Sequence, residues 1–438
     1  MSAARADLLD LEPERFAARL RDEGGRAYLT WDHDARRVVA SAPWLDELAS
    51  WLGADERDFH EHEGVFMAVG PETGALMTAV VHKTVRGQAA GGLRQWPYPR
   101  LEALIRDGLR LSLGMSRKNA LAGLWWGGGK GVIARQRGDR HADPGYRRAL
   151  YREYGAFTTS LRGVYVTAED VGTRPEDLAA VFETTRFATC VPASVGGSGN
   201  PSPATAKGVV CAIEGALAHT SRGTIAGKTI AMQGAGNVAS YMIGELLERE
   251  VGRVIATDIC AARCEQVRDR FAHAGDRVEI RHAAPGDLAI FAEPCDVLAP
   301  NALGGVLGPE TIPMIQAPIV CGAANNQLLD DRRDDRALAE RGIIYVPDFV
   351  ANRMGIVNCA NEQYGNLPDD PAIERHFSRD WDNAVFVVTK RILARAEREQ
   401  TTTSLAANAL ADEACRVPHP IWGHRSRTII EGLLANTR

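Results

Sequence analysis

Apolar and polar residues recur along the chain with the spacings of both strands and helices. Residues 65–69 and 75–81 are apolar segments on either side of a Gly-Pro-Glu-Thr-Gly turn, which predicts a β-hairpin. Apolar residues recur at helical spacing over 100–120 and 204–218, which predicts two helices. Residues 371–398 have the pattern of one long amphipathic helix, which we expect to return and pack on the N-terminal domain.

A strand–turn–helix–strand unit occupies residues 228–258. Its turn carries the pattern G-x-G-x-x-A, and its second strand ends at an acid, as in the dinucleotide-binding fingerprint. The glycines let a pyrophosphate approach the backbone, and the helix N-terminus attracts its negative charge. Asp258 would accept hydrogen bonds from a ribose hydroxyl and repel a 2′-phosphate, which favours NAD over NADP. The expected cofactor contacts are Gly234, Ala235, Gly236, Asn237, Val238 and Asp258.

Three further apolar segments, 295–300, 317–323 and 343–346, resemble strands. Ligands of open α/β sheets bind at the carboxyl ends of the strands. The polar residues that follow the first two segments are therefore candidate cofactor or substrate contacts: Asn301, Asn325 and Asn326.

Two lysines, Lys118 and Lys130, are the first candidates for chemistry. Lys130 follows three consecutive glycines, which predict a tight turn where a ligand can approach the main chain. It is not a phosphate loop, because Leu124 occupies the position of the first glycine and Gly131 follows the lysine instead of a hydroxyl residue. Taken alone, the stretch fits a surface turn with a solvated lysine equally well.

A second stretch, 165–173, strengthens the catalytic interpretation. An apolar run ends there in Glu169, Asp170 and a glycine, as when a buried strand delivers carboxylates to a loop. A carboxylate there and Lys130 could form an acid/base pair if the two segments meet.

Composition narrows the class of protein. The chain has 438 residues, enough for two domains, with 45% hydrophobic and 24% charged residues and a formal net charge of -5. This charge gives no reason to expect binding to nucleic acid or to an anionic membrane. Apolar runs are shorter than the ~18–20 residues of a membrane span, and the N-terminus lacks the apolar core of a secretory signal. We therefore expect a cytoplasmic protein.

Cysteine and histidine spacing does not indicate a metal. The eight cysteines are dispersed, and Cys260 and Cys264 have no second pair to complete a zinc site. Reduced, mostly buried thiols fit a cytoplasmic protein better. Phe59-His-Glu-His-Glu63 resembles a ligand cluster, but adjacent residues of an extended chain point to opposite faces, so a solvated segment is favoured. We predict no metal site.

Residues 196–203, Gly-Gly-Ser-Gly-Asn-Pro-Ser-Pro, are the clearest hinge signal in the chain. We expect a substrate-binding and oligomerisation domain over 1–200, completed by 360–438. The NAD-binding domain is expected over 201–359.

Seven short motifs support a resemblance to one known family, in the family's order from about residue 75 to 365. They are Gly91-Gly-Leu-Arg94, Met115-Ser-Arg-Lys-Asn-Ala120, Gly127-Gly-Gly-Lys130, Thr167-Ala-Glu-Asp-Val-Gly-Thr173, Gly199-Asn-Pro-Ser-Pro-Ala-Thr205, Gly234-Ala-Gly-Asn-Val-Ala239 and Asn326-Gln-Leu328. The chain resembles the glutamate/leucine/phenylalanine/valine dehydrogenases, most closely the leucine-dehydrogenase-like branch. The resemblance implies an α/β fold with a substrate domain and a Rossmann-type domain separated by a cleft, in a homo-oligomer.

The resemblance also implies roles for individual residues. Lys118 would bind the substrate α-carboxylate, Lys130 would be the base that activates water, and Asp170 would exchange protons with the amino group. Backbone and polar groups would complete the substrate and nicotinamide contacts: Gly91, Gly92, Thr205 and Asn326.

Departures from the family pattern bear on specificity. Ala90 stands where glutamate-specific relatives have lysine and leucine-type relatives have leucine, which argues against glutamate and for a larger apolar pocket. Arg353 and Met354 add bulk and a charge near the expected active site. Two alternatives stay open: they bind an unusual polar group of the substrate, or they point away from the site. Trp125-Trp126 is also atypical. The other expected pocket walls are Ala168, Ile356 and Cys359.

The leading hypothesis is NAD-dependent, reversible oxidative deamination of an L-amino acid with a bulky apolar side chain, giving a 2-oxo acid and ammonia. One alternative is a relative specialised for an unusual biosynthetic amino acid. Another is a catalytically silent NAD-binding regulatory paralogue. Retention of Lys118, Lys130 and Asp170 argues against the silent paralogue, which has no physical need for two lysines and a carboxylate in one cleft.

Overall fold

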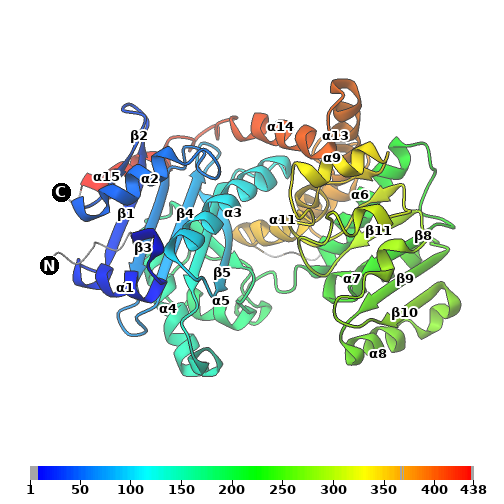
Figure 1. Cartoon of the computed structure of the whole chain (residues 1–438), viewed down its shortest axis with the longest axis horizontal. Coiled ribbons are helices and arrows are strands. Elements are labelled where there is room, and N and C mark those ends of the chain that lie inside the picture. Colours follow the sequence, from blue (N-terminus) through cyan, green and yellow to red (C-terminus); the bar gives the residue numbers. More distant parts are fainter. Residues whose placement is uncertain (1–7, 366, 368, 436–438) are drawn as a thin grey trace.

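The chain folds around two β-sheets that lie side by side (Figure 1). The computed structural model describes residues 8–365, 367 and 369–435. The first sheet has seven strands between residues 26 and 169, and the second has six strands between residues 229 and 345. The domain limits at residues 200 and 360 stay a prediction.

The first sheet is mixed, with strand order β2-β1-β3-β4-β6-β5-β7. The predicted hairpin is confirmed as β3 and β4, and the predicted helix as α3, which packs against β4 and β6. Strand β5 lies between β6 and β7 and is parallel to both. The strands are β1 (Arg26–Asp32), β2 (Arg37–Ala40), β3 (Gly64–Val69), β4 (Leu76–Lys83), β5 (Ala89–Trp96), β6 (Gly127–Ala134) and β7 (Tyr165–Glu169). The helices of this half are α1 (Pro13–Asp22), α2 (Asp46–Ala54), α3 (Leu101–Leu121), α4 (Pro144–Ser160) and α5 (Pro175–Phe182).

The three glycines before Lys130 do not form the predicted turn, because they are the first three residues of the buried strand β6. A Cβ on Gly128 would collide with the backbone of α3 at Ser112 and Ser116. A Cβ on Gly129 would lie 2.6 Å from the Tyr165 ring. These glycines therefore allow α3 and the Tyr165 ring, which comes from β7, to approach β6 closely, and they place Lys130 inside a sheet.

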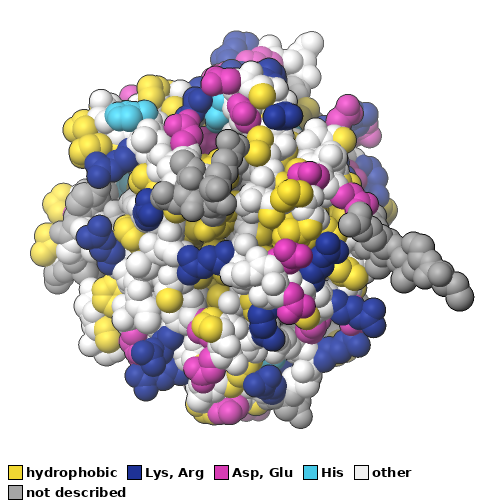
Figure 2. Space-filling view, turned by 90° about the vertical axis from the view of Figure 1, so that its left-hand side faces the viewer, with side chains coloured by type: hydrophobic (Ala, Val, Ile, Leu, Met, Phe, Trp, Pro, Cys, Tyr) yellow, Lys and Arg dark blue, Asp and Glu magenta, His cyan; other side chains and the backbone are white. Residues whose placement is uncertain are grey.

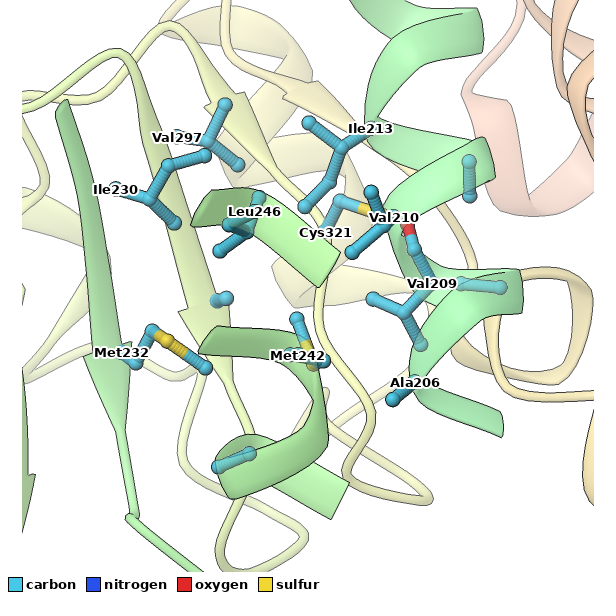
Figure 3. Packing of buried hydrophobic residues seen from close by; sticks show 14 of the residues in the cluster. Ala206, Val209, Val210, Ile213, Ile230, Met232, Met242, Leu246, Val297 and Cys321 are labelled. Atoms are coloured by element: carbon cyan, nitrogen blue, oxygen red, sulfur yellow. The ribbon is translucent and has the colours of Figure 1, made fainter. Parts of the chain in front are cut away.

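The second sheet is fully parallel, with order β10-β9-β8-β11-β12-β13, the doubly wound arrangement of a dinucleotide-binding domain. Side chains from α6, α7, β8 and β11 interdigitate in its core (Figure 3). The strands are β8 (Thr229–Gln233), β9 (Arg253–Asp258), β10 (Val278–His282), β11 (Val297–Pro300), β12 (Ile319–Val320) and β13 (Ile344–Tyr345). The helices of this half are α6 (Ser202–His219), α7 (Asn237–Glu248), α8 (Ala261–Arg270), α9 (Arg333–Glu340), α10 (Asp348–Ala351) and α11 (Met354–Asn361).

The single long helix predicted over 371–398 is wrong. The segment contains the short helix α12 (Pro371–Glu374), a 3₁₀ turn and then α13 (Val385–Glu399). Polar residues separate them, and Ser378 Oγ accepts a hydrogen bond from the backbone N–H of Trp381, a local turn that competes with helix.

The C-terminal helices contact both halves of the molecule. Helix α13 packs mainly on α6, not on the N-terminal domain as expected. Helix α14 (Thr403–Cys415) packs on α3, and Ile430 and Leu433 of α15 (Arg425–Ala435) enter the core beneath the first sheet. The chain thus returns to the first half only after passing across the second (Figure 1).

A disulfide joins the segment in which the chain leaves the first half to helix α11 of the second half. Cys190 and Cys359 are bonded, with their Cα atoms 5.1 Å apart. The Glu362 carboxylate reinforces this junction by accepting hydrogen bonds from the backbone N–H groups of Cys190, Val191 and Ser198. The expectation of reduced thiols is therefore wrong for this pair, whereas the other six cysteines are free.

The surface carries charges of both signs. On the end of the molecule formed by the first sheet, basic and acidic side chains are interspersed (Figure 2). Among the described helices, none is long and apolar enough to cross a membrane.

Candidate active site

Three neighbouring strands present the candidate catalytic groups on one face of the first sheet. Gly92 on β5 is paired with Ala168 on β7, and Arg94 on β5 is paired with Val132 on β6. Alternate residues of a strand share a face, so Lys130, two positions before Val132, points to the same side as Gly92 and Arg94. Asp170 follows the end of β7 on that side.

Lys130 and Asp170 meet, as the acid/base hypothesis required. Lys130 is 3% exposed, and its Nζ lies 2.8 Å from Asp170 Oδ2. Burial lowers the pKa of Lys130 and the nearby Arg94 adds to this effect, whereas Asp170 opposes it. Burial alone would raise the pKa of Asp170, but Lys130 and Arg94 outweigh it and lower that pKa to about 2. The carboxylate is thus ionised at neutral pH, beside a lysine that loses its proton more easily than usual.

Lys118, on α3, reaches from the first half toward the second. Its Nζ lies 3.4 Å from Asn325 Oδ1, which also accepts a hydrogen bond from Asn352 Nδ2 at 2.7 Å. Burial lowers the pKa of Lys118, the Lys130 ammonium acts in the same direction, and the Asp348 carboxylate opposes both. The two lysines therefore influence each other across one site between the two sheets.

Gly91 and Gly92 are needed for close packing at this site. A Cβ on Gly92 would lie 2.7 Å from both Asp170 Cβ and the Glu169 carbonyl oxygen. The Gly91 carbonyl accepts a hydrogen bond of 2.7 Å from the Tyr165 hydroxyl. Glycine at position 92 thus leaves the room in which Asp170 stands next to Lys130.

The predicted dinucleotide turn has the geometry of a phosphate cradle. Gly234 has a φ of 99°, which favours glycine, and Gly236 precedes the first residue of α7. A Cβ on Gly236 would meet no atom within 4 Å, so the space above the helix N-terminus is open. Asp258 Oδ2 accepts the Ala235 N–H at 3.0 Å, which ties the acid to this turn. Asn237 and Val238 form the first turn of α7, where unpaired N–H groups can bind phosphate.

The remaining predicted cofactor contacts lie beyond the carboxyl ends of the strands of the second sheet and in the first turn of α6. Asn301 follows β11, and its Nδ2 is a buried donor without a partner among the described residues. Asn326 is exposed, with a left-handed φ of 52°. Thr205 lies in the first turn of α6, and its hydroxyl donates to the Pro201 carbonyl at 2.9 Å. An unsatisfied amide donor beside an open glycine cradle fits a dinucleotide that supplies the missing acceptor.

Sequence reasoning gave no role to Arg94 and Asp348, and it named Glu169 only as one of two carboxylates that could pair with Lys130. Arg94 bonds Asp170, Asp348 accepts the Asn326 N–H, and burial raises the pKa of Glu169 to about 6. Arg94 could have been found because it lies two positions after Gly92 and therefore on the same face of β5. Asp348 closely follows β13, at the end of a strand where ligands bind.

Both halves of the chain match models of one family. Residues 73–187 match "Glu/Leu/Phe/Val dehydrogenase, dimerisation domain", and residues 196–417 match "Glutamate/Leucine/Phenylalanine/Valine dehydrogenase". The chain belongs to this dehydrogenase family. It is thus an oxidoreductase of the nicotinamide-dependent amino-acid dehydrogenases.

Individual relatives of this dehydrogenase support the same placement. The leucine dehydrogenase of Bacillus cereus is 38% identical over 356 residues, covering 81% of this chain and 91% of the relative. The phenylalanine dehydrogenase of Lysinibacillus sphaericus is 35% identical over 322 residues, 73% of this chain and 82% of the relative. The crystal structure of L-tryptophan dehydrogenase from Nostoc punctiforme superposes with a TM-score of 0.66 at 31% identity, over 81% of this chain and 96% of that one. The predicted family, branch and two-domain α/β fold are confirmed.

The predicted pocket walls of the dehydrogenase are packed more tightly than expected. Ala90 is 1% exposed and lies in one apolar cluster with Trp126, against which Ile356 packs. The indole of Trp126 therefore takes up part of the space that the small Ala90 leaves. Ala168 packs against the disulfide formed by Cys359, so this wall is a covalent bridge and not the side chain of a free cysteine.

Arg353 points away from the catalytic groups. It is fully buried, and its guanidinium donates to the carbonyls of Leu121, at 2.6 Å, and Asn383. Burial lowers the pKa of Arg353 to about 9, and Arg391 acts in the same direction. Met354 is also buried, in the core of the second half. Of the two alternatives for Arg353 and Met354, the structure thus supports orientation away from the site.

A cavity of about 390 Å³ lies apart from the predicted site residues. Its lining residues come from β4, α3, α14 and the adjoining loops: His60, His82, Lys83, Val85, Leu113, Arg117, Asp412, Cys415 and Arg416. In the nearby histidine-rich segment, the His62 ring bonds the Leu109 carbonyl at 3.0 Å. Within the described ranges, no group of three histidine, cysteine or acidic side chains is placed to hold a metal ion.

Proposed function

We propose that this dehydrogenase catalyses the NAD-dependent, reversible oxidative deamination of an L-amino acid with a bulky apolar side chain. The products are the 2-oxo acid and ammonia. The observation that carries the proposal is the buried contact between Lys130 and Asp170, with Lys118 close enough that the Lys130 ammonium helps to lower the pKa of Lys118. Such a group of two lysines and one carboxylate suits a substrate that carries both a carboxylate and an amine.

Each of these side chains has a defined task in the reaction. NAD, which the turn at Gly234 and Gly236 and the carboxylate of Asp258 would hold, would supply the acceptor for the hydride of the substrate Cα. The Lys118 ammonium binds the α-carboxylate, and ionised Asp170 takes a proton from the substrate ammonium. Lys130 Nζ, once neutral, takes a proton from the water that adds to the resulting iminium carbon. The amino group of this adduct takes back the proton held by Asp170 and leaves as ammonia, while loss of the hydroxyl proton gives the 2-oxo acid. Burial favours this neutral form of Lys130, which is why a lysine can act as a base near neutral pH.

Asp258 supports NAD over NADP. Its carboxylate lies at the end of β9 and is held by the backbone N–H groups of Ala235 and Cys260. A negative charge fixed there attracts ribose hydroxyls and repels a 2′-phosphate. We therefore propose that NADP supports little turnover.

The substrate class follows from the pocket and the relatives. Ala90 brings no ammonium to pair with a side-chain carboxylate, which argues against glutamate. The relatives include leucine and phenylalanine dehydrogenases and a solved tryptophan dehydrogenase. We propose branched or aromatic amino acids, and a homo-oligomer built through the segment that matches the dimerisation model.

The test is NADH formation from NAD with a panel of L-amino acids, and the reverse reaction with 2-oxo acids and ammonia. We expect turnover with branched or aromatic substrates and a loss of at least about 100-fold in kcat for Lys130→Ala. Lys390→Ala, which removes an exposed lysine of α13, is the matched control and should keep full activity. Absence of turnover in both directions with the whole panel would refute the proposed function.

A further inference from the structure

We propose, on the basis of the function proposed above, that Arg94 is a positioning residue that anchors one oxygen of Asp170 and prepares the Lys130–Asp170 pair for proton transfer. Arg94 stands on β5, between the strand that carries Lys130 and the strand that leads to Asp170. From this strand it bonds Asp170 directly and acts on Lys130 through its charge.

Arg94 connects Asp170 to a second carboxylate. Its Nε donates to Asp170 Oδ2 at 3.1 Å, and its Nη1 donates to Asp107 Oδ2 at 3.1 Å. The Tyr98 hydroxyl donates to the same Asp107 oxygen at 2.6 Å. The guanidinium is thus held at both ends, with 19% of its side chain exposed. A group held in this way can fix the direction of the Asp170 carboxylate.

The two oxygens of Asp170 are used differently. Oδ2 receives both Lys130 Nζ, at 2.8 Å, and Arg94 Nε, at 3.1 Å. Oδ1 accepts no hydrogen bond from any residue that the structure describes. Arg94 and Lys130 therefore hold one oxygen and leave the other available for the substrate amino group.

Arg94 also changes the charge balance around Lys130. A guanidinium keeps its charge at any pH where the protein is folded, so it always disfavours a second positive charge nearby. By sharing Oδ2, it also weakens the attraction between Asp170 and the Lys130 ammonium. Asp107 acts in the opposite sense, because its negative charge favours protonated Lys130. The other titratable groups that interact with this pair are Lys118, Tyr98, Tyr165 and Glu169, and Asp348 in turn acts on Lys118.

A purely structural role is the competing explanation, because the same ion pairs also join β5 to α3. The two explanations differ in how activity depends on pH. If Arg94 only stabilises the fold, its substitution lowers the stability and the amount of active enzyme, but the pH profile of the enzyme that remains folded does not change. A positioning residue moves the acidic limb of kcat/KM, which reports the ionisation of the free enzyme's base.

The experiment compares pH profiles of kcat/KM for oxidative deamination in the full-length wild type, Arg94→Gln, Arg94→Lys and Asp107→Asn. For Arg94→Gln we expect the acidic limb to move to higher pH by about one unit, since loss of a nearby positive charge makes Lys130 harder to deprotonate. Asp107→Asn should move the limb to lower pH. Arg94→Lys should restore the wild-type limb but not the full kcat, because an ammonium lacks the planar fork.

The substrate's own amino group titrates identically in every variant, so differences between limbs belong to the enzyme. KM for the amino acid should stay nearly constant, because Arg94 does not contact the substrate. If Arg94→Gln does not fold, the question is still decided by Arg94→Lys, whose acidic limb should match the wild type, and by Asp107→Asn, whose limb should lie at lower pH. Limbs that coincide in all folded variants overturn the role of Arg94 while leaving the proposed function intact. A wild type without activity at any pH refutes the proposed function itself.

Discussion

The disulfide between Cys190 and Cys359 makes a quantitative prediction about stability. It closes a loop with a sequence separation of 169, which includes the whole second sheet. In the chain-entropy description, a cross-link that closes so long a loop disfavours the unfolded chain by about 5 kcal/mol at 25 °C. Removing the bridge should therefore lower the free energy of unfolding by up to about 5 kcal/mol.

This loss corresponds to a large shift in Tm. A unit of this size loses about 2–4 °C for each kcal/mol, so we expect Cys190→Ala to lower the Tm of the second half by about 10–20 °C. Adding a dithiol reductant to the wild type should produce the same shift, and the reductant should leave Cys190→Ala unchanged. Cys211→Ala is the matched control, because Cys211 is buried and free and its loss removes packing but no bridge.

Calorimetry with and without reductant measures these shifts, and thiol titration in denaturant tests the bridge directly. Six thiols should react before reduction and eight afterwards. Eight reactive thiols in the unreduced protein would refute the bridge. A bridge that is present but whose removal leaves the Tm unchanged would refute the entropic reasoning.

Two further predictions concern glycine contacts and acid. Gly128→Ala should destabilise the protein by about 3 kcal/mol or more in urea unfolding, because the new Cβ would collide with the α3 backbone. Gly236→Ala should keep the stability of the protein but weaken NADH binding in a fluorescence titration. Equal effects of the two variants would contradict the assignment of Gly128 to packing and of Gly236 to cofactor binding. Burial lowers the pKa of His62 to about 3 and that of His82 well below its usual value. Both histidines protonate near pH ~6.5 in the unfolded chain, so the free energy of unfolding should fall by roughly 2–3 kcal/mol per pH unit below that pH. Equal midpoints of urea unfolding at pH 7 and pH 5 would contradict this prediction.

Local patterns predicted the elements whose signals are local. The hairpin of β3 and β4, helix α3 and the unit from β8 to β9 were predictable because their periodicity and turn residues agree with their final environment. The fingerprint also predicted that Asp258 meets the turn, since strand, turn and acid lie within one supersecondary unit. The contact of Lys130 with Asp170 was a hypothesis from two separate segments, and the sheet order decided it.

Signals that depend on distant segments were missed. The glycines before Lys130 have the composition of a turn, and only the approach of α3 and Tyr165 shows why a buried strand requires them. The bridge between Cys190 and Cys359 has no local signature, because its ends are far apart in sequence. The packing of Trp126 beside Ala90 was not predicted, because it depends on how β6, which follows Trp126, packs in the sheet.

The return of the C-terminal helices to the first half affects the order in which the protein can fold during synthesis. The second sheet, the helices α6 to α11 and helix α13, which packs on α6, lie in one continuous stretch, so that half can fold once about residue 400 has left the ribosome. The core under the first sheet joins Tyr28 to Ile430 and Leu433. It therefore stays open, with apolar surface exposed, until α15 has been made. The core of the first half is thus completed after that of the second, and translation speed across α14 and α15 should affect its yield more than that of the nucleotide-binding half.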